Sequence, residues 1–345
     1  MNTQVLFPDA NAIASAAELF REGQLVGFPT ETVYGLGANA LNSDAVRSIF
    51  AAKGRPADNP LIVHIWNRDQ LNDLCEIPPV NEKLMDAFWP GPLTLLFPRK
   101  PTVPDVVTAG LPTVAIRMPS HPVAFEMLKA CNLPIAAPSA NLSGKPSPTK
   151  AEHVFKDMHG IIPLILDGGD CDVGLESTVV DACHGQPIIL RPGDITQEML
   201  ENVLGCPVAI AKSTLEPLQK GEKPLSPGMA HQHYSPDGSV ILVTGEEQNV
   251  LAEMRRLVQE DTAHGYKSCV MCFTEHVEAL HDCHPHDLGS VHSDKEIGRR
   301  LFSILRKLDD EKMERIYSEV VTPEGNGLAV MNRLGRAAAF RTIHA

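Results

Sequence analysis

Three features are scarce in this chain of 345 residues: long apolar runs, regularly spaced cysteines and basic side chains. No apolar run approaches the ~20 residues that a membrane-spanning helix needs. The 8 cysteines follow no common spacing, which argues against a disulfide framework and favours reduced thiols. Acidic residues outnumber basic ones by 43 to 30, and the formal net charge of -13 repels a phosphate backbone. We therefore expect neither a membrane protein, nor a disulfide-stapled one, nor a general nucleic-acid binder.

Length and composition indicate an ordinary globular protein with more than one domain. Hydrophobic residues make up 43% and charged residues 21% of the chain, which is typical of folded proteins. A chain of 345 residues exceeds one typical domain, so two separate cores are expected. Residues 1–20 contain no basic stretch followed by an apolar core, which predicts a cytoplasmic protein without a secretory leader.

Hydrophobic periodicity divides the chain into three parts. Over 1–211, helical and strand-like segments alternate, which predicts an α/β domain with a mixed sheet. Residues 212–238 are rich in proline, glycine and polar residues and lack either period, as expected of a linker. From 239 to 345, strands and amphipathic helices predict a small Rossmann-like α/β domain.

The individual elements follow from the same patterns. Strands are expected near 25–28, 61–65, 93–97, 114–117, 135–137, 163–166, 178–181 and 188–190, then near 240–243, 268–273 and 316–321. Helices are expected near 10–22, 43–53, 122–130, 150–158 and 196–204, then near 246–259, 294–308 and 327–338. Residues 29–37 are expected to form a loop.

The most informative segment is KGRPADNPL at 53–61, where two cations flank a glycine between a helix and a strand. Lys53 supplies a mobile charge and Arg55 a planar fork, while Gly54 lets the backbone approach a ligand closely. Such a corner suits a polyphosphate. A solvated helix end, where cations favour the dipole, explains the segment equally well when it is taken alone.

Two loops and two arginines add polar groups beside predicted strands. The loop PSANLSGKPSPT at 138–149 offers hydroxyls and an amide after an apolar strand, although the same residues make plain turns. The segment FPTETVYGLG at 28–37 has neither a Walker A ending nor a dinucleotide fingerprint. Arg117 and Arg191 stand at strand ends, where they either bind anionic groups or form surface ion pairs.

Taken together, these segments resemble the YrdC-like family of threonylcarbamoyl-AMP synthases. SPGMAHQHYSP at 226–236 and GLAVMNRLGRAA at 327–338 are similar to the linker and the C-terminal domain of the longer, two-domain form. The resemblance covers nearly the whole chain. It implies a YrdC-like twisted mixed β-sheet with flanking helices, joined by a linker over the active site to a small Rossmann-like α/β domain.

The resemblance also implies the residues of the site. Carried over by motif, the threonine-binding residues are Thr32, His64, Arg117, Ala137 and Ser177, with Arg117 facing the carboxylate. The ATP-binding residues are Lys53, Arg55, Asn59, Thr113, Ser139, Asn141, Ser147, Arg191 and the linker residue Tyr234, with Lys53 and Arg55 as the catalytic pair.

The implied reaction makes L-threonylcarbamoyl-AMP from L-threonine, bicarbonate and ATP, with release of pyrophosphate. It is the first step of threonylcarbamoyl-adenosine modification next to the anticodon of tRNAs that decode ANN codons. Mg²⁺ is expected on the ATP phosphates rather than on protein side chains, and no organic prosthetic group is needed. A downstream tRNA threonylcarbamoyl-transferase complex is the expected partner, and a weak contact with tRNA stays open.

Two rival functions and two minor signals remain. A YrdC-like domain can be an RNA-binding module without turnover, or part of another carbamoyl-group enzyme.

The cysteines and histidines of 269–286 include a C-x-x-C spacing, but residues three apart on a strand point to opposite faces, which disfavours zinc. The basic side chains of 294–308 are expected to be the solvated side of a core helix rather than an RNA contact.

Overall fold

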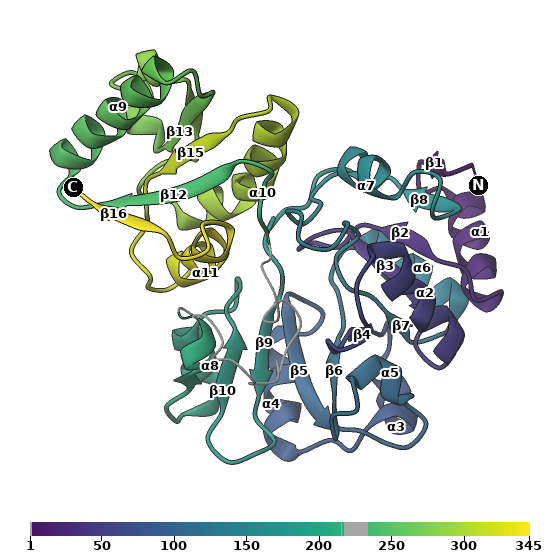
Figure 1. Cartoon of the computed structure of the whole chain (residues 1–345). Coiled ribbons are helices and arrows are strands. Elements are labelled where there is room, and N and C mark those ends of the chain that lie inside the picture. Colours follow the sequence, from purple (N-terminus) through teal and green to yellow (C-terminus); the bar gives the residue numbers. More distant parts are fainter. Residues whose placement is uncertain (1, 215, 217–233) are drawn as a thin grey trace. The chain divides into compact units, whose positions relative to one another are not determined.

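The computed structural model describes residues 2–214, 216 and 234–345 and contains two compact units (Figure 1). Of these residues, 2–143 and 147–214 belong to the first unit, whereas 144–146, 216 and 234–345 belong to the second. The expected linker at 212–238 therefore lies largely outside the described residues, and its placement over an active site stays a prediction. In the described part of the chain, no helix is both long and apolar enough to cross a membrane.

The first unit is built on a mixed sheet. Its described strands run in the order β1-β8-β2-β3-β7-β4-β6-β5-β9-β10-β11. Their bounds are β1 Gln4–Leu6, β2 Val26–Phe28, β3 Gly35–Asn39, β4 Ile62–His64, β5 Leu93–Pro98, β6 Thr113–Arg117, β7 Ile135–Ala136, β8 Leu164–Leu166, β9 Thr178–Asp181, β10 Ile188–Arg191 and β11 Ala209–Ile210. The central pair β4 and β6 is parallel, while β5 and β6 are antiparallel. This confirms the expected mixed sheet.

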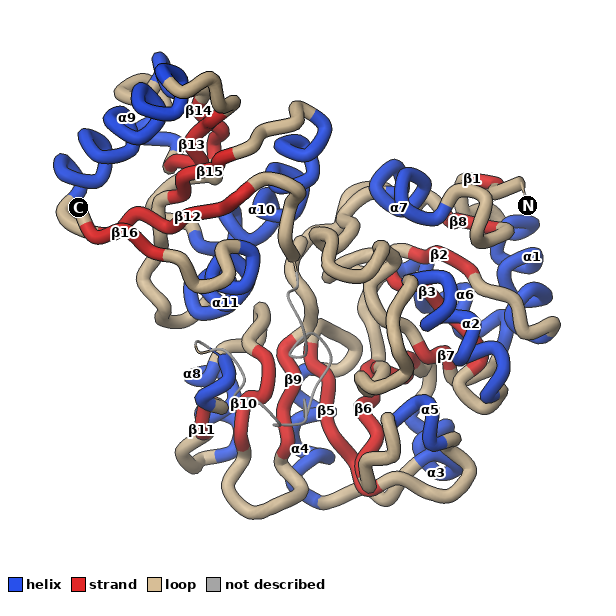
Figure 2. The backbone as a smooth tube through the Cα atoms, in the orientation of Figure 1, coloured by secondary structure: helices blue, strands red, loops and turns tan. Residues whose placement is uncertain are grey.

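Helices flank this sheet (Figure 2), and buried side chains of the helices and the sheet form two large apolar cores. Their bounds are α1 Ala10–Arg21, α2 Ser43–Lys53, α3 Leu71–Leu74, α4 Pro79–Phe88, α5 Asp105–Thr108, α6 Pro122–Cys131, α7 Ala151–Met158 and α8 Gln197–Leu204. Helices α1 and α6 pack together beside β2, whereas α2 and α4 share a core with the central strands β4, β5 and β6. Central-strand residues of that core are Val63, Leu95 and Ile116, so their neighbours in sequence face the opposite side of the sheet.

Helix α2 sets the position of the cationic segment. Its first turn is capped by Asn42, whose side chain accepts hydrogen bonds from the amides of Asp44 and Ala45. It ends at Gly54, which adopts the left-handed conformation with φ of 67° that glycine enters without steric cost. Lys53 therefore belongs to the last helical turn, and Arg55 starts the following loop.

The second unit is a smaller α/β domain with a parallel sheet in the order β14-β13-β15-β12-β16. Its elements are β12 Ser239–Thr244, α9 Glu247–Ala263, β13 Ser268–Cys272, β14 Pro285–Asp287, α10 Asp294–Asp310, β15 Arg315–Ser318, α11 Gly327–Ala337 and β16 Thr342–His344. Helix α9 packs on β12 and β13, and α10 packs on α11. The expected Rossmann-like architecture is confirmed.

Helix α10 is a core helix, as expected, but Arg306 of its expected solvated basic side is buried and donates from Nη2 to the carbonyl oxygen of Pro146 at 2.6 Å. Its apolar residues Ile297, Leu301 and Leu305 are fully buried. Among its basic residues, Arg300 pairs with Asp287 and Glu296 at 2.6 and 2.5 Å. The charge of Arg300 is therefore paired within the second unit. A contact with RNA is not needed to explain the presence of this side chain.

Cys269 and Cys272 of the C-x-x-C spacing both lie buried within β13. Burial raises the pKa of each thiol to about 12, so both stay protonated near neutral pH. Over 2–214, 216 and 234–345, no group of three or more histidine, cysteine, aspartate or glutamate side chains is arranged to hold a metal ion.

Two departures from the sequence-based expectation stand out: the helix α4 was not expected, and β3 occupies part of the expected loop at 29–37. Gly35 and Gly37 gave this segment a turn-like composition, yet they serve close packing. A Cβ atom at Gly37 would lie 2.9 Å from atoms of Phe20, Phe28 and Ile135. The short helices α3 and α5 and the short strands β1, β11, β14 and β16 were also not expected.

Gly193 provides a test of how tightly the first unit is packed beside Ser177. A Cβ atom there would meet the backbone of 176–178, with the carbonyl oxygen of Glu176 at 2.7 Å. We predict that Gly193→Ala lowers the free energy of unfolding by about 1–3 kcal/mol, as overpacking does. Chemical denaturation measures this. The control Gly335→Ala, inside α11 with its nearest contact at 3.4 Å, should be neutral or stabilising. Equal effects of the two substitutions would contradict the packing argument.

Candidate active site

A row of buried polar residues crosses the centre of the first unit's sheet. His64 on β4 is the register partner of Arg117 on β6, and Arg117 is the partner of Thr94 on β5. Paired residues on neighbouring strands point to the same face. This is the face opposite α2 and α4, and it carries the small apolar cluster of Ile62, Leu96, Ala115, Val179 and Leu190. The sheet thus presents a cation and hydroxyl and imidazole groups on an otherwise apolar surface.

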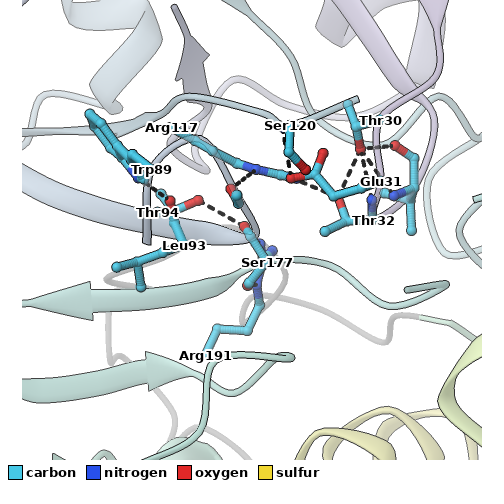
Figure 3. A network of polar contacts seen from close by, with 12 residues as sticks. Thr30, Glu31, Thr32, Trp89, Leu93, Thr94, Arg117, Ser120, Ser177 and Arg191 are labelled. Carbon is cyan, nitrogen blue, oxygen red and sulfur yellow. Dashed lines mark hydrogen bonds and ion pairs between the residues drawn. The ribbon is translucent and has the colours of Figure 1, made fainter. Parts of the chain in front are cut away.

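Arg117 is held by three groups from two segments of the chain, the adjacent residues Glu31 and Thr32 and the distant Gly91 (Figure 3). Its Nη2 lies 2.7 Å from Oε1 of Glu31, and its Nη1 donates to Oγ1 of Thr32 at 2.7 Å. Its Nε donates to the carbonyl oxygen of Gly91 at 3.2 Å. Only 3% of the arginine side chain and 8% of the glutamate side chain are exposed. The sheet therefore holds a desolvated ion pair at this point.

The carboxyl of Glu31 stays ionised in this setting. Burial acts to raise its pKa, but the charge and hydrogen bond of Arg117 and the amide of Ser120 outweigh burial and hold the pKa below its usual value. The Ser120 amide donates to Oε1 at 3.1 Å. Oε2 is buried and has no hydrogen-bond partner within the described residues. Half of this carboxylate is therefore left for another donor.

A second polar chain joins Thr94, Ser177 and Arg191 (Figure 3). The hydroxyls of Thr94 and Ser177 lie 2.7 Å apart. Arg191, at the end of β10, donates from Nη2 to the hydroxyl of Ser177 and from Nε to its carbonyl oxygen, both at 3.1 Å. Since Thr94 is also the register partner of Arg117, this chain connects a predicted threonine residue and a predicted ATP residue to the central row.

His64 is buried beside the ion pair of Arg117 and Glu31. Burial, followed by the charge of Arg117, lowers the pKa of His64 to about 3, so the imidazole is neutral near pH 7. Its ring meets Phe28 edge-on, with ring centroids 6.0 Å apart. Nδ1 is buried and has no hydrogen-bond partner among the residues described. A neutral imidazole with a free ring nitrogen can bind a small polar ligand.

Lys53 anchors the loop that follows β7. Its Nζ donates to the carbonyl oxygens of Ser139 and Asn141 at 2.5 and 2.6 Å. The hydroxyl of Ser139 in turn donates to Oδ1 of Asn141 at 2.5 Å. Three predicted ATP residues are thereby brought together, with a positive charge underneath a loop of backbone and hydroxyl groups.

Arg55 and Asn59 follow Lys53 and place further polar groups in the interior. Nε and Nη2 of Arg55, and both amide atoms of Asn59, are buried without a hydrogen-bond partner in the described parts of the chain. Burial lowers the pKa of Arg55 to about 10 against the opposing effect of Asp58, which still leaves the guanidinium charged at neutral pH. Buried polar atoms are normally paired, so these groups are poised for an anionic ligand.

The remaining predicted residues are placed as follows. Ser147 donates to Oε1 of Glu176 at 2.5 Å, and Ala137, just after β7, donates its amide to Ile62 at 2.9 Å. Thr113 starts β6, four positions before Arg117. Tyr234 belongs to the second unit, where its ring packs 5.2 Å from that of Phe302, so its contact with ATP stays a prediction.

Sequence reasoning missed the partners that hold the predicted residues. Glu31, Thr94 and Glu176 contact Arg117, Ser177 and Ser147, respectively. The only available signal was Glu31, the single acid in the hydroxyl-rich segment at 28–37. Thr94 stands in ordinary strand sequence, where only the strand register sets its neighbours, and Glu176 stands in ordinary loop sequence.

The buried histidine makes stability depend on pH. The unfolded chain binds a proton at His64 below its ordinary pKa of 6.5, whereas the folded chain does so only near pH 3. Stability contributed by the neutral imidazole is therefore lost as pH falls below 6.5. We predict that His64→Gln reduces the loss of unfolding free energy between pH 7 and pH 5 by about 2 kcal/mol. Denaturant titrations at both pH values measure this. An unchanged loss in His64→Gln, or the same reduction in the exposed control His292→Gln, would contradict the assignment.

Two family models match the chain in succession. The Sua5, YciO and YrdC model, described as telomere recombination, matches residues 18–193. The model described as the C-terminal domain of threonylcarbamoyl-AMP synthase matches residues 195–339.

Similar proteins extend over the same length. The threonylcarbamoyl-AMP synthase of Bacillus subtilis is 47% identical, with 96% of this chain and 94% of that protein covered. The synthase of Pyrococcus abyssi is 45% identical, with 96% and 95% covered. A crystal structure of Pyrococcus abyssi Sua5 complexed with L-threonine is 44% identical and matches with a TM-score of 0.92, covering 100% of this chain and 99% of that one. Over both its units, this chain belongs to the threonylcarbamoyl-AMP synthase family.

Proposed function

We propose that the chain makes L-threonylcarbamoyl-AMP from L-threonine, bicarbonate and ATP, with release of pyrophosphate. The observation that carries the proposal is a set of buried polar atoms that have no partner in the described part of the chain and lie in two places, beside Arg117 on the sheet and in the segment after α2. Arg55, Asn59, His64 and Glu31 all present buried polar atoms without partners in the described residues. A likeness of TM-score 0.92 to a protein complexed with L-threonine supports threonine as one ligand.

Threonine is proposed to bind at Thr32, His64, Arg117, Ala137 and Ser177. Arg117 supplies the buried positive charge for the carboxylate, and its guanidinium is fixed by Thr32 before the substrate arrives. Pre-set orientation of this kind lowers the entropy lost on binding. The neutral His64 offers a ring nitrogen without adding a second cation to the site.

ATP is proposed to bind at Lys53, Arg55, Asn59, Thr113, Ser139, Asn141, Ser147, Arg191 and Tyr234. Arg55 is the residue whose guanidinium nitrogens are most available, because two of them lack partners within the described chain. The ammonium of Lys53 donates to the loop carbonyls of Ser139 and Asn141. Charge neutralisation along a triphosphate by fixed cations is the main protein contribution that phosphoryl chemistry requires.

The proposed chemistry proceeds in two steps. The amine of threonine and bicarbonate form a carbamate with loss of water. A carbamate oxygen then bonds to the α-phosphorus of ATP while the bond from that phosphorus to the bridging oxygen breaks, and pyrophosphate leaves. No covalent bond to the protein is needed. The residues around Arg117 orient the carbamate, and the cations Lys53, Arg55 and Arg191 stabilise the charge on the phosphates.

Several finer points belong to the same proposal. Mg²⁺ is expected to accompany the ATP phosphates, where it would neutralise charge on the leaving pyrophosphate. The product is expected to serve a transferase complex that modifies adenosine next to the anticodon of ANN-decoding tRNAs in the cytoplasm. The alternative of an RNA-binding module without turnover is disfavoured by the net charge of -13.

An omission assay tests the proposed reaction. Purified protein with ATP, Mg²⁺, threonine and bicarbonate should release pyrophosphate, and omission of threonine or bicarbonate should abolish the release. Pyrophosphate is detected with a coupled enzyme assay. Release that does not depend on threonine, or tRNA binding without any release, would contradict the proposal.

Arg55 offers a sharper test of the phosphate site. We predict that Arg55→Ala lowers kcat/KM for ATP by about 100-fold or more, since a fixed transition-state donor contributes that much. Thermal unfolding should show unchanged or higher stability, because a buried guanidinium without hydrogen-bond partners at Nε and Nη2 is removed. The matched control Arg47→Ala removes an exposed arginine of α2 that pairs with Asp44. Near wild-type kcat/KM in Arg55→Ala would rule out the assigned role.

A further inference from the structure

Glu31 is not among the proposed threonine-binding residues, although it forms a buried ion pair with one of them, Arg117. Only 6% of the surface of Glu31 is exposed, and its two carboxylate oxygens have different surroundings. Oε1 faces Arg117 Nη2 at 2.7 Å and accepts the Ser120 amide at 3.1 Å. Oε2 is equally buried but accepts no hydrogen bond from any described residue.

An ion pair that served only to hold the fold would not leave this oxygen unpaired. A buried carboxylate oxygen without a donor forfeits its hydration and gains nothing in return. Natural interiors therefore contain few such atoms, and those that occur call for a functional explanation. The missing partner of Oε2 must carry N–H or O–H donors and be small enough to enter a buried site.

The charges around Oε2 narrow the class of that partner. The ionisable groups whose charges act on Glu31 or respond to it are Arg117, His64, His121 and Cys171. Burial lowers the pKa of His121 and of His64, and it raises the pKa of Cys171 above its usual range, so these three groups are neutral near pH 7. Arg117 is the only cation among them. A second positive group therefore fits beside the carboxylate, whereas a second anion does not.

Arg117 also keeps capacity for a ligand. A guanidinium has five N–H bonds. The described protein acceptors are Gly91 for Nε, Thr32 for Nη1 and the carboxylate of Glu31 facing Nη2. A carboxylate can thus approach the same guanidinium while Glu31 stays in place.

We propose that Glu31 binds the α-ammonium group of threonine through Oε2, while Arg117 binds the α-carboxylate. The buried pair then matches a zwitterion: two opposite protein charges meet two opposite ligand charges, and the desolvated site remains neutral with and without the amino acid. Each new contact is a charge-assisted hydrogen bond. After the amine has lost a proton or become a carbamate N–H, Oε2 still accepts the remaining N–H. The inference rests on the proposed function only in taking threonine as the ligand.

This assignment differs from a purely positioning role in which Glu31 merely orients Arg117. In the positioning role, loss of the Glu31 charge disturbs the guanidinium and weakens every ligand that carries a carboxylate. In the binding role, only ligands with an amino group lose affinity. Threonine and its amine-free analogue (R)-3-hydroxybutanoate, which keeps the carboxylate and the hydroxyl, separate the two.

The experiment measures the affinity of the full-length protein for both ligands by isothermal titration calorimetry. Glu31→Gln keeps the shape of the side chain and an oxygen for the Ser120 amide. We expect it to weaken threonine binding about 10- to 150-fold, the range for hydrogen bonds to charged groups, and to leave (R)-3-hydroxybutanoate within about 3-fold of wild type. Glu82→Gln, an exposed position on α4, is the matched control and should change neither affinity.

Two outcomes with Glu31→Gln overturn the inference. Equal weakening of both ligands assigns Glu31 to positioning of Arg117, and unchanged threonine binding removes it from the site. Should Glu31→Gln fail to fold, Glu31→Asp retains the charge at a shorter reach and must weaken threonine more than the analogue. Wild-type protein that binds threonine but never releases pyrophosphate would defeat the proposed function alone.

Discussion

The buried ion pair of Arg117 and Glu31 is the interaction on which the site depends. It joins the end of β6 to the segment between β2 and β3, and Thr32 and Gly91 complete the shell around the guanidinium. A buried ion pair is weak support for stability, because desolvation offsets most of the attraction. Its retention in the middle of a sheet face is better explained by a ligand that needs both charges.

The sheet explains why this pair stands among the other polar groups. Strand register aligns His64, Arg117 and Thr94 across β4, β6 and β5, and Thr94 then reaches Ser177 and Arg191. The opposite side of the same strands is packed by α2 and α4. Helix α2 in turn ends at Lys53, whose ammonium fixes the loop of Ser139 and Asn141. One scaffold therefore orients the proposed threonine site and the loop that Lys53 anchors.

Much of the fold could be predicted because its strands are short apolar runs between polar breaks. Strands that follow this pattern closely are those at 93–98, 113–117 and 178–181. Helices were also predicted close to their observed bounds at 122–131, 151–158 and 197–204. Strand β3 did not follow the pattern, since Gly35 and Gly37 hide a packing role behind a turn-like composition. The residues of the candidate site were identified in a different way. Arg117, Lys53 and Arg55 were evident as cations at element ends, and their functional assignment came from the resemblance to a family. Glu31, Thr94 and Glu176 could not be found this way, because their contacts depend on how distant segments meet.

A crystal structure of the protein with L-threonine and a non-hydrolysable ATP analogue tests the central claim most directly. We expect the threonine carboxylate within hydrogen-bond distance of Arg117 and its ammonium within the same distance of Glu31 Oε2. The phosphates should lie against Arg55. Threonine bound away from the Arg117–Glu31 pair, or an amino group that points to another acceptor while Oε2 stays unpaired, would contradict the account.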